Sequence, residues 1–186
     1  MKLIKVEKYN PEWKKEFEKA KFFYKELLKD IDPKIVHVGS TSVKGMWAKP
    51  ILDIDIIVSN TLGSNKVIKL LEGVGYTHIG NMGVKGREAF KYSNDNQNIK
   101  WMKHNLYVCI SGNENLKNHL LLKKHLQNNK DALEEYSKLK YELAKKYPDD
   151  INSYVDGKTE LITGFLKAEG MDLKKLNRIK SINKKN

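Results

Sequence analysis

The spacing of apolar residues predicts a long helix near the start of the chain. One apolar stripe recurs at intervals of three and four residues, as on one face of a helix: Trp13, Phe17, Ala20, Tyr24 and Leu27. Asn10 and Pro11 open this helix, because asparagine caps helix N-termini and proline is favoured at the first helical position. Residues 2–8 are expected to form a short edge strand ahead of it.

Runs of β-branched and aromatic residues predict a set of strands in the first 110 residues. The predicted strands cover residues 35–38, 51–58, 76–79, 88–92 and 104–110. The last two are expected to pair as a hairpin around the polar segment 93–98. A helix is expected over residues 66–71, and the segment from Gly39 to Ser42 is expected to form a turn that leads into a short helix.

From about Asn113 onward, the pattern changes to helical periodicity. Leucine and aromatic residues predict three helices, the third of them after a break at Pro148. We therefore expect an α/β (α+β) fold, with a mixed sheet core over residues 1–112 and a helical part of the same domain over 113–170. Residues 171–186 contain few apolar anchors and are expected to be a loosely held basic tail.

Composition excludes several classes of protein. The chain has 186 residues, and its 40% of hydrophobic residues are enough for a packed core. It contains no apolar run of about 18 residues, so a membrane span is not expected, and its start lacks the apolar segment of a signal peptide. A single cysteine, Cys109, excludes an intramolecular disulfide and a multi-cysteine zinc site, and fits a reducing, cytoplasmic compartment.

The charge raises the question of nucleic acid, because 35 basic residues against 23 acidic ones give a net charge of +12. Only Arg87 and Arg178 are arginines, however, and lysine is a poorer reader of phosphates and bases than the arginine fork. Part of the charge also lies in the expected tail. Specific nucleic-acid binding is therefore not expected.

Two aspartates mark the strand over residues 51–58 as chemically unusual. Asp53 and Asp55 point to the same face, because alternate side chains of a strand share a face. Two carboxylates on one face repel each other unless a cation compensates them, and Mg²⁺ (or Mn²⁺) commonly joins carboxylates to substrate phosphates. The alternative is a polar strand edge that faces solvent. On the first interpretation, both side chains lie partly exposed in a cleft, close to Ser40.

The turn that precedes this strand suits a phosphate. Gly39 and Ser40 allow the backbone to approach a phosphate closely, and a helix that starts there adds free N–H groups. The spacing between this Gly-Ser turn and an aspartate–hydrophobic–aspartate strand resembles the nucleotidyltransferase superfamily. Over a longer span, residues 37–43, Gly45 and residues 48–54 resemble the signature of the GrpB family, a branch of that superfamily.

Further segments extend the resemblance over roughly residues 3–168. They are Asn10 to Trp13, Arg87 with Phe90, Asn118 to Leu120, Glu135-Tyr136, Leu139-Lys140 and Gly157 to Thr159. The resemblance implies a nucleotidyltransferase-like mixed sheet core with a helical C-terminal part. It also implies that Asp53 and Asp55 bind a divalent metal and that the Gly39–Ser40 turn, with Thr41 beside it, holds nucleotide phosphates.

Other candidates follow from residue type. Lys49, Arg87 and Lys158 are candidate phosphate partners, and Arg87 is the strongest of them because its fork matches phosphate oxygens. His119 is expected to serve packing or hydrogen bonding on its helix.

A third carboxylate, common on a later strand of active nucleotidyltransferases, is missing from residues 104–110. If the aspartates face the His104 side of that strand, His104 is the catalytic base and Glu88 a helper from the neighbouring strand. If they face the Tyr107 side, no such group remains there.

Two hypotheses follow for the function. The first is a metal-dependent nucleotidyltransferase that transfers a nucleotide from an NTP to an unknown small-molecule acceptor. The second is a catalytically silent nucleotide- or metabolite-binding module of the same fold. Turnover of an NTP separates the two.

Overall fold

A five-stranded mixed sheet forms the centre of the protein in the computed structural model, which describes residues 3–92 and 101–183. The strands are β1 (Lys34–Val38), β2 (Leu52–Val58), β3 (Tyr76–Gly80), β4 (Arg87–Tyr92) and β5 (His104–Ile110). Their order is β1-β2-β5-β4-β3, with β2 and β5 parallel and the other neighbouring pairs antiparallel. The predicted α/β fold with a mixed sheet is confirmed, as is the pairing of the last two strands.

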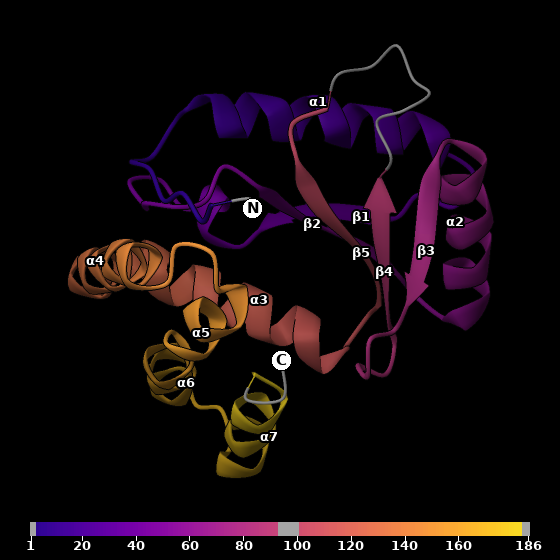
Figure 1. The fold of residues 1–186 in the computed structure, drawn as a ribbon. Helices are drawn as coiled ribbons and strands as arrows, with labels where there is room; N and C mark the ends of the chain where they lie inside the picture. The colour runs from indigo at the N-terminus through magenta and orange to yellow at the C-terminus, as the bar shows by residue number, and fades with distance from the viewer. Residues whose placement is uncertain (1–2, 93–100, 184–186) are drawn as a thin grey trace.

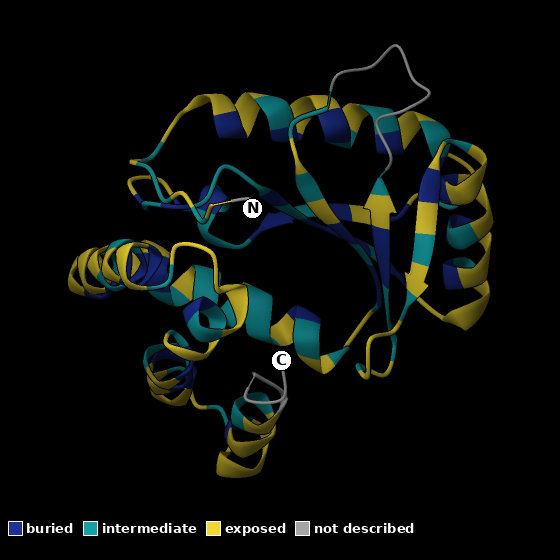
Figure 2. Cartoon of the chain, in the orientation of Figure 1, coloured by how far each residue is buried: buried dark blue, intermediate teal, exposed yellow. Residues whose placement is uncertain are grey.

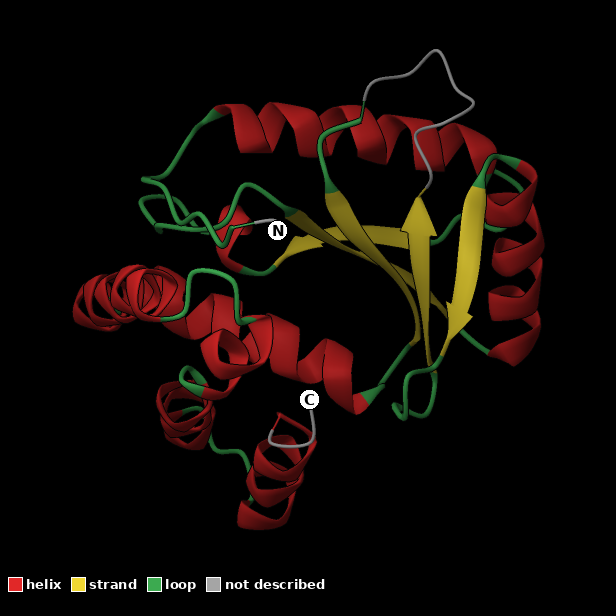
Figure 3. Ribbon diagram, viewed as in Figure 1, coloured by secondary structure: helices red, strands yellow, loops and turns green. Residues whose placement is uncertain are grey.

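Helices cover both faces of the sheet (Figures 1 and 3). One face packs against α1 (Glu12–Leu27) and α2 (Thr61–Gly73). A second, helical half lies beyond the other face (Figure 1) and consists of α3 (Glu114–Asn128), α4 (Lys130–Lys146), α5 (Ile151–Asp156), α6 (Thr159–Ala168) and α7 (Leu173–Asn183). The segment predicted as a single third helix is divided near Gly157 into α5 and α6.

The main core lies between the sheet and the layer of α1 and α2. The predicted stripe of α1 is buried there, and the side chain of Asn10 accepts a hydrogen bond from the backbone N–H of Glu12 at 3.0 Å. Figure 2 colours the buried parts of the sheet dark blue. Leu52, Ile54 and Ile56 of β2 enter the same core. Because side chains alternate along a strand, the aspartates between them point to the opposite face, toward the helical half.

Two local predictions at the ends of elements were wrong. Residues 2–8 were expected to form an edge strand, but the described part of this segment makes only an isolated bridge between Glu7 and Ala48. Helix α2 begins at Thr61, five residues before the predicted start. Its start is set by Asn60, whose side chain accepts a hydrogen bond from the backbone N–H of Gly63 at 2.9 Å.

The C-terminal segment also differs from the prediction of a loose tail. Residues 173–183 form α7, which packs on α6 and buries Leu176. Two ion pairs attach the helix to its neighbours, from Arg178 to Glu114 at 3.0 Å and from Lys180 to Glu160 at 2.6 Å. A single well-placed leucine and these pairs are enough to dock a segment whose composition is mostly polar.

Replacing Leu176 with alanine is expected to destabilise the protein by about 2 kcal/mol, the lower end of the range for buried leucines, because α7 packs on one side only. Urea denaturation followed by circular dichroism measures this change. The matched control is Leu173→Ala in the same helix, where the leucine is 65% exposed and its loss is expected to change little. Equal effects of the two substitutions would show that α7 does not dock through Leu176.

Within the described part of the chain, no helix has the length and apolar character that a membrane span requires.

Candidate functional site

The turn after β1 is held in a conformation that glycine alone adopts readily. Gly39 has φ +68° and ψ −174°, and a 3-10 helix over Ser40–Ser42 follows it directly. The hydroxyl of Ser42 donates to the Gly39 carbonyl at 2.7 Å and closes the turn. A Cβ atom on residue 39 would overlap with Oδ2 of Asp53, so the turn and the first aspartate are packed directly against each other.

Hydrogen bonds of Thr41 with His37 and with the backbone of Ile51 stabilise this turn. The Thr41 hydroxyl lies 2.9 Å from Nε2 of His37 and donates to the carbonyl of Ile51 at 3.3 Å. His37 is buried and stacks on Phe17, with ring centroids 4.6 Å apart. Burial, and secondarily the charge of Lys123, lowers the pKa of His37 to about 3, so the imidazole is neutral at physiological pH. Thr41 lines the candidate cavity, but its hydroxyl is committed to the turn.

This buried histidine predicts acid sensitivity. Because its folded-state pKa lies below its unfolded value of about 6.5, the unfolded chain binds the extra proton, and stability falls as the pH drops from about 6.5 toward 3. The free energy of unfolding is expected to lose about 2 kcal/mol from His37 between pH 7 and pH 5. Urea titrations at both pH values should show a smaller loss in His37→Gln than in the parent. An unchanged pH dependence in His37→Gln would contradict the assignment.

The two aspartates of β2 share a face, but they differ in exposure. Asp53 is half-buried and lines a cavity, whereas the side chain of Asp55 is completely buried. The expectation that both are partly exposed is therefore wrong for Asp55, which α3 covers. His119 of α3 lies with Nδ1 2.8 Å from Oδ2 of Asp55, and Asn105 of β5 donates from Nδ2 to Oδ1 of Asp53 at 2.8 Å.

One oxygen of each carboxylate is left over by these hydrogen bonds. Oδ1 of Asp55 is buried and has no hydrogen-bond partner among the described residues, which is costly for a charged group unless a cation compensates it. Burial also raises the pKa of Asp53, so this carboxylate too is poorly solvated. The residues present therefore fit a divalent cation such as Mg²⁺. No group of three or more His, Cys, Asp or Glu side chains suited to a metal occurs in the described ranges, so other ligands would be phosphate or water.

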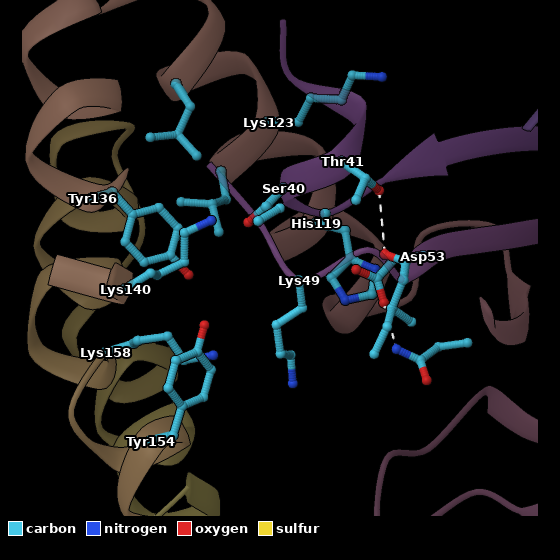
Figure 4. A pocket seen from close by; sticks show the side chains of 16 residues that line it. Ser40, Thr41, Lys49, Asp53, His119, Lys123, Tyr136, Lys140, Tyr154 and Lys158 are labelled. Carbon is cyan, nitrogen blue, oxygen red and sulfur yellow. Dashed lines mark hydrogen bonds between the residues drawn. The ribbon is translucent and has the colours of Figure 1, made fainter. Parts of the chain in front are cut away.

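A cavity of about 240 Å³ opens between the Gly39 turn, Asp53 and the helical half. Figure 4 shows lysine and tyrosine side chains that reach this cavity from the helices, opposite Asp53 and Ser40. Four lysines contribute to its lining: Lys49, Lys123, Lys140 and Lys158. Asp53 is the carboxylate that faces them among the described lining residues. Positive charge is thus in excess, as a bound polyanion requires.

The lysines of this cavity are partly desolvated and repel one another. Burial, followed by repulsion from Lys49, lowers the pKa of Lys158 to about 8. Burial also lowers the pKa of Lys140, which is only 2% exposed and donates to the backbone carbonyl of Trp47. The ammonium of Lys158 lies 4.3 Å from the ring centroid of Tyr154, and that of Lys49 lies 5.1 Å from it. A polyanion would relieve this repulsion.

Two of the predicted site residues lie on the other face of the sheet. Asp53 is in register with Asn105, so it shares a face with Asn105 and Tyr107, and His104 points to the core of α1 and α2. There Nε2 of His104 lies 2.7 Å from the hydroxyl of Tyr76. Glu88 is opposite Val108 on that same face and pairs with His78 at 2.7 Å. The structure therefore does not bring His104 and Glu88 to the aspartates.

Arg87 lies on the same face as Asp53, but farther along the sheet. Its guanidinium is 4.9 Å from the ring centroid of Tyr107, and Nη1 donates to Oδ1 of Asn115 at 3.3 Å. Arg87 lines a second cavity rather than the one at Asp53. The structure brings together six of the predicted residues, Gly39, Ser40, Thr41, Lys49, Asp53 and Lys158. Asp55 lies two residues beyond Asp53 on the same face of β2.

Comparison with known proteins identifies the family. A model of the family described as "GrpB protein" matches residues 3–168. The chain belongs to the GrpB family. A crystal structure of the GrpB protein from Enterococcus faecalis is similar to it with a TM-score of 0.76 at 28% identity, covering 90% of this chain and 100% of that one. The resemblance drawn from residues 37–54 is thereby confirmed.

Curated members of the GrpB family show how far the similarity extends. The "Glutamate-rich protein GrpB" of Alkalihalophilus pseudofirmus is 30% identical over 85% of this chain and 91% of its own length. The "UPF0157 protein YqkA" of Bacillus subtilis is 32% identical over 86% of this chain, but the match spans only 45% of that protein. Structures of the Cid1 poly(U) polymerase have TM-scores of up to 0.48 at 14–16% identity, too weak a similarity to indicate a function.

Several residues of this GrpB site were not predicted to belong to it, although His119, Tyr136 and Lys140 lie in segments that resemble the family. Asn105 and His119 hold the aspartates, and Tyr136, Lys140 and Tyr154 line the cavity. His119 was expected to serve packing or hydrogen bonding, and it does form a hydrogen bond. The register of β5 against β2 is what selects Asn105, and a contact between α3 and the sheet is what selects His119.

Proposed function

We propose that this GrpB-family chain is a metal-dependent nucleotidyltransferase that uses an NTP and a small acceptor molecule. The observation that carries the proposal is the cavity in which Lys49, Lys140 and Lys158 face Asp53 across the Gly39 turn. A surplus of buried lysines is costly to maintain without an anion, and a triphosphate supplies several negative charges in a row. The buried Cys109 supports a cytoplasmic compartment for this activity.

The turn and the lysines have complementary roles in this proposal. The missing Cβ of Gly39 makes room for the Asp53 carboxylate, so the turn and Asp53 together line the side of the cavity where a phosphate group would lie. The lysine ammonium groups neutralise the outer phosphates as point charges. With a volume of about 240 Å³, the cavity suits the phosphate part of a nucleotide better than the whole molecule.

A divalent cation fits the remaining oxygens of Asp53 and Asp55 and, when bound, supplies charge stabilisation at the phosphates. In the proposed reaction, an acceptor oxygen or nitrogen forms a bond to the α-phosphorus and releases its proton to solvent. The bond from the α-phosphorus to the bridging oxygen breaks, and pyrophosphate leaves. The chain's own contribution is to fix the phosphates between the turn and the lysines, so that attack is in line.

A silent nucleotide-binding module is the second candidate, and Asn105 is the observation that favours it. Asn105 lies beside Asp53 on the neighbouring strand, where a third carboxylate would complete a metal site. An amide cannot supply that negative charge, although it can orient Asp53. The silent module binds the same phosphates through the same lysines without turnover.

The lysine cavity is tested by replacing Lys158 with glutamine. The affinity for ATP, measured by calorimetry with Mg²⁺ present, is expected to fall about tenfold or more, since a charge-assisted hydrogen bond is worth about 1.5–3 kcal/mol. The matched control is Lys167→Gln, an exposed lysine of α6 outside the cavity, which is expected to keep the parent's affinity. Absence of binding by any of the four NTPs to the parent would contradict both candidates. Pyrophosphate release across acceptors then separates the enzyme from the silent module.

A further inference from the structure

We propose that the second cavity, enclosed by α3, α7 and the segment between β3 and β4, binds the acceptor, and that this acceptor joins an anionic group to an apolar body. The proposal rests on the proposed function, because an acceptor is needed only if the first cavity holds a nucleotide. The second cavity has a volume of about 700 Å³, which accommodates a small organic molecule.

The position of this cavity relative to the nucleotide cavity is the first reason. His119 and Leu122, one turn apart on α3, contribute to the walls of both cavities. The two cavities are therefore neighbours, and His119, which contacts Asp55, forms part of the wall between them. A shared wall is expected when the two cavities bind the two substrates of one reaction.

The positions of the two arginines indicate that the acceptor carries an anionic group. The sequence holds two arginines among 35 basic residues, and both Arg87 and Arg178 line this cavity. Arg178 is paired with Glu114, but Nε of Arg87 is buried and has no hydrogen-bond partner among the described residues. The Arg87 fork is held over Tyr107 and by Asn115, so it is oriented in advance for an oxyanion.

The apolar body of the acceptor follows from the rest of the wall. Leu122, Ile162, Leu166 and Ile179 contribute aliphatic surface to the cavity, on α3, α6 and α7. Lys85 and Lys175 add positive charge to its lining. An amphiphilic anion satisfies both kinds of surface, whereas a sugar or another fully polar acceptor leaves the aliphatic wall against polar groups.

Helix α7 supplies one wall of this cavity. The family match ends at residue 168, and α7 begins at Leu173. The wall that contains Lys175, Arg178 and Ile179 therefore lies outside the part of the chain that the family model covers.

Octanoate and octyl phosphate are suitable probes, because they share an apolar body and differ in the anionic group. Calorimetry is expected to show at least tenfold tighter binding of one or both than of 1-octanol and octylamine. Binding of octanoate alone assigns a carboxylate acceptor, and binding of octyl phosphate alone assigns a phosphorylated one. The site is also expected to accept its probe while Mg²⁺-ATP is bound.

Variants localise the binding. Arg87→Gln is expected to weaken the bound probe at least tenfold. Ile179→Trp, which fills the cavity from an outer helix without disturbing the sheet, should also weaken the probe and leave ATP binding unchanged. Lys174→Gln removes a charge from α7 outside the cavity lining and should have no effect.

Three results would overturn the proposal. The first is equal binding of 1-octanol and the two anions. The second is unchanged probe affinity in both Arg87→Gln and Ile179→Trp, and the third is direct competition between probe and ATP. If the probe binds through Arg87 but no NTP binds the parent, the proposed function fails and the cavity loses its role as an acceptor site while remaining an anion site.

Discussion

Replacement of Asp53 with asparagine is expected to abolish the Mg²⁺-dependent part of nucleotide binding and to leave the folded protein at least as stable as the parent. Asparagine still accepts the hydrogen bond from Asn105, and it removes a carboxylate whose pKa burial raises, which at neutral pH is a cost to the folded state. Pyrophosphate release, where the parent shows it, is expected to fall about 10³-fold, because the charge stabilisation lost is several kcal/mol.

Thermal unfolding with ATP, with Mg²⁺ and with both measures the binding effect directly. The melting temperature of the parent is expected to rise most when both are present. The control is Asp149→Asn, an exposed aspartate in the loop between α4 and α5, which should behave as the parent does. A joint effect of ATP and Mg²⁺ that persists in Asp53→Asn would remove Asp53 from the proposed metal site.

Replacement of Gly39 with alanine is expected to have the largest effect on stability, a loss of about 3 kcal/mol. The backbone angles of Gly39 are nearly exclusive to glycine, and the added Cβ would overlap with the Asp53 carboxylate. The melting temperature should therefore fall by about 10 °C, and nucleotide binding should be lost as the turn moves away from Asp53.

Gly73→Ala is the matched control for this substitution. Gly73 ends α2 without a left-handed backbone, and a Cβ there meets no atom within 4 Å. This variant is expected to be as stable as the parent or slightly more so. In the background Asp53→Ala, Gly39→Ala should cost less, because part of the overlap is gone. An equal cost in both backgrounds would show that backbone strain alone accounts for it.

The sequence was sufficient for the elements whose apolar positions report directly on burial. The stripe of α1 and the β-branched strand β2 both pack as predicted, because the core between them is built from those same residues. Segments 2–8 and 173–183 could not be predicted in this way. The first makes a single described bridge, from Glu7 to Ala48. In the second, Leu173, Leu176 and Ile179 recur at helical intervals, but the docking that buries Leu176 also depends on two ion pairs with distant residues.

The residues of the candidate site likewise fall into a predictable and an unpredictable group. Gly39 and Ser40 directly follow β1, and Asp53 lies in β2 opposite Val38, the last residue of β1. The antiparallel pairing of these two strands therefore brings the three residues together. The sequence left open which face of β5 the aspartates share, and the in-register pairing of Asp53 with Asn105 decides against His104. Lys140 comes from α4; it lies in a segment that resembles the family, but only the packing of α4 places it at this cavity.

The alternation along β2 also bears on how the chain finds its fold. A slip of one residue between β2 and either neighbour turns every side chain to the opposite face. Asp53 and Asp55 would then be placed against the aromatic residues of α1, and Ile54 would enter the lysine cavity. Burying two unpaired carboxylates in that core costs far more than a typical mispairing, so misregistered sheets are penalised strongly during folding. Asp53 and Asp55 thus disfavour the wrong strand register, whatever ligand the folded site binds.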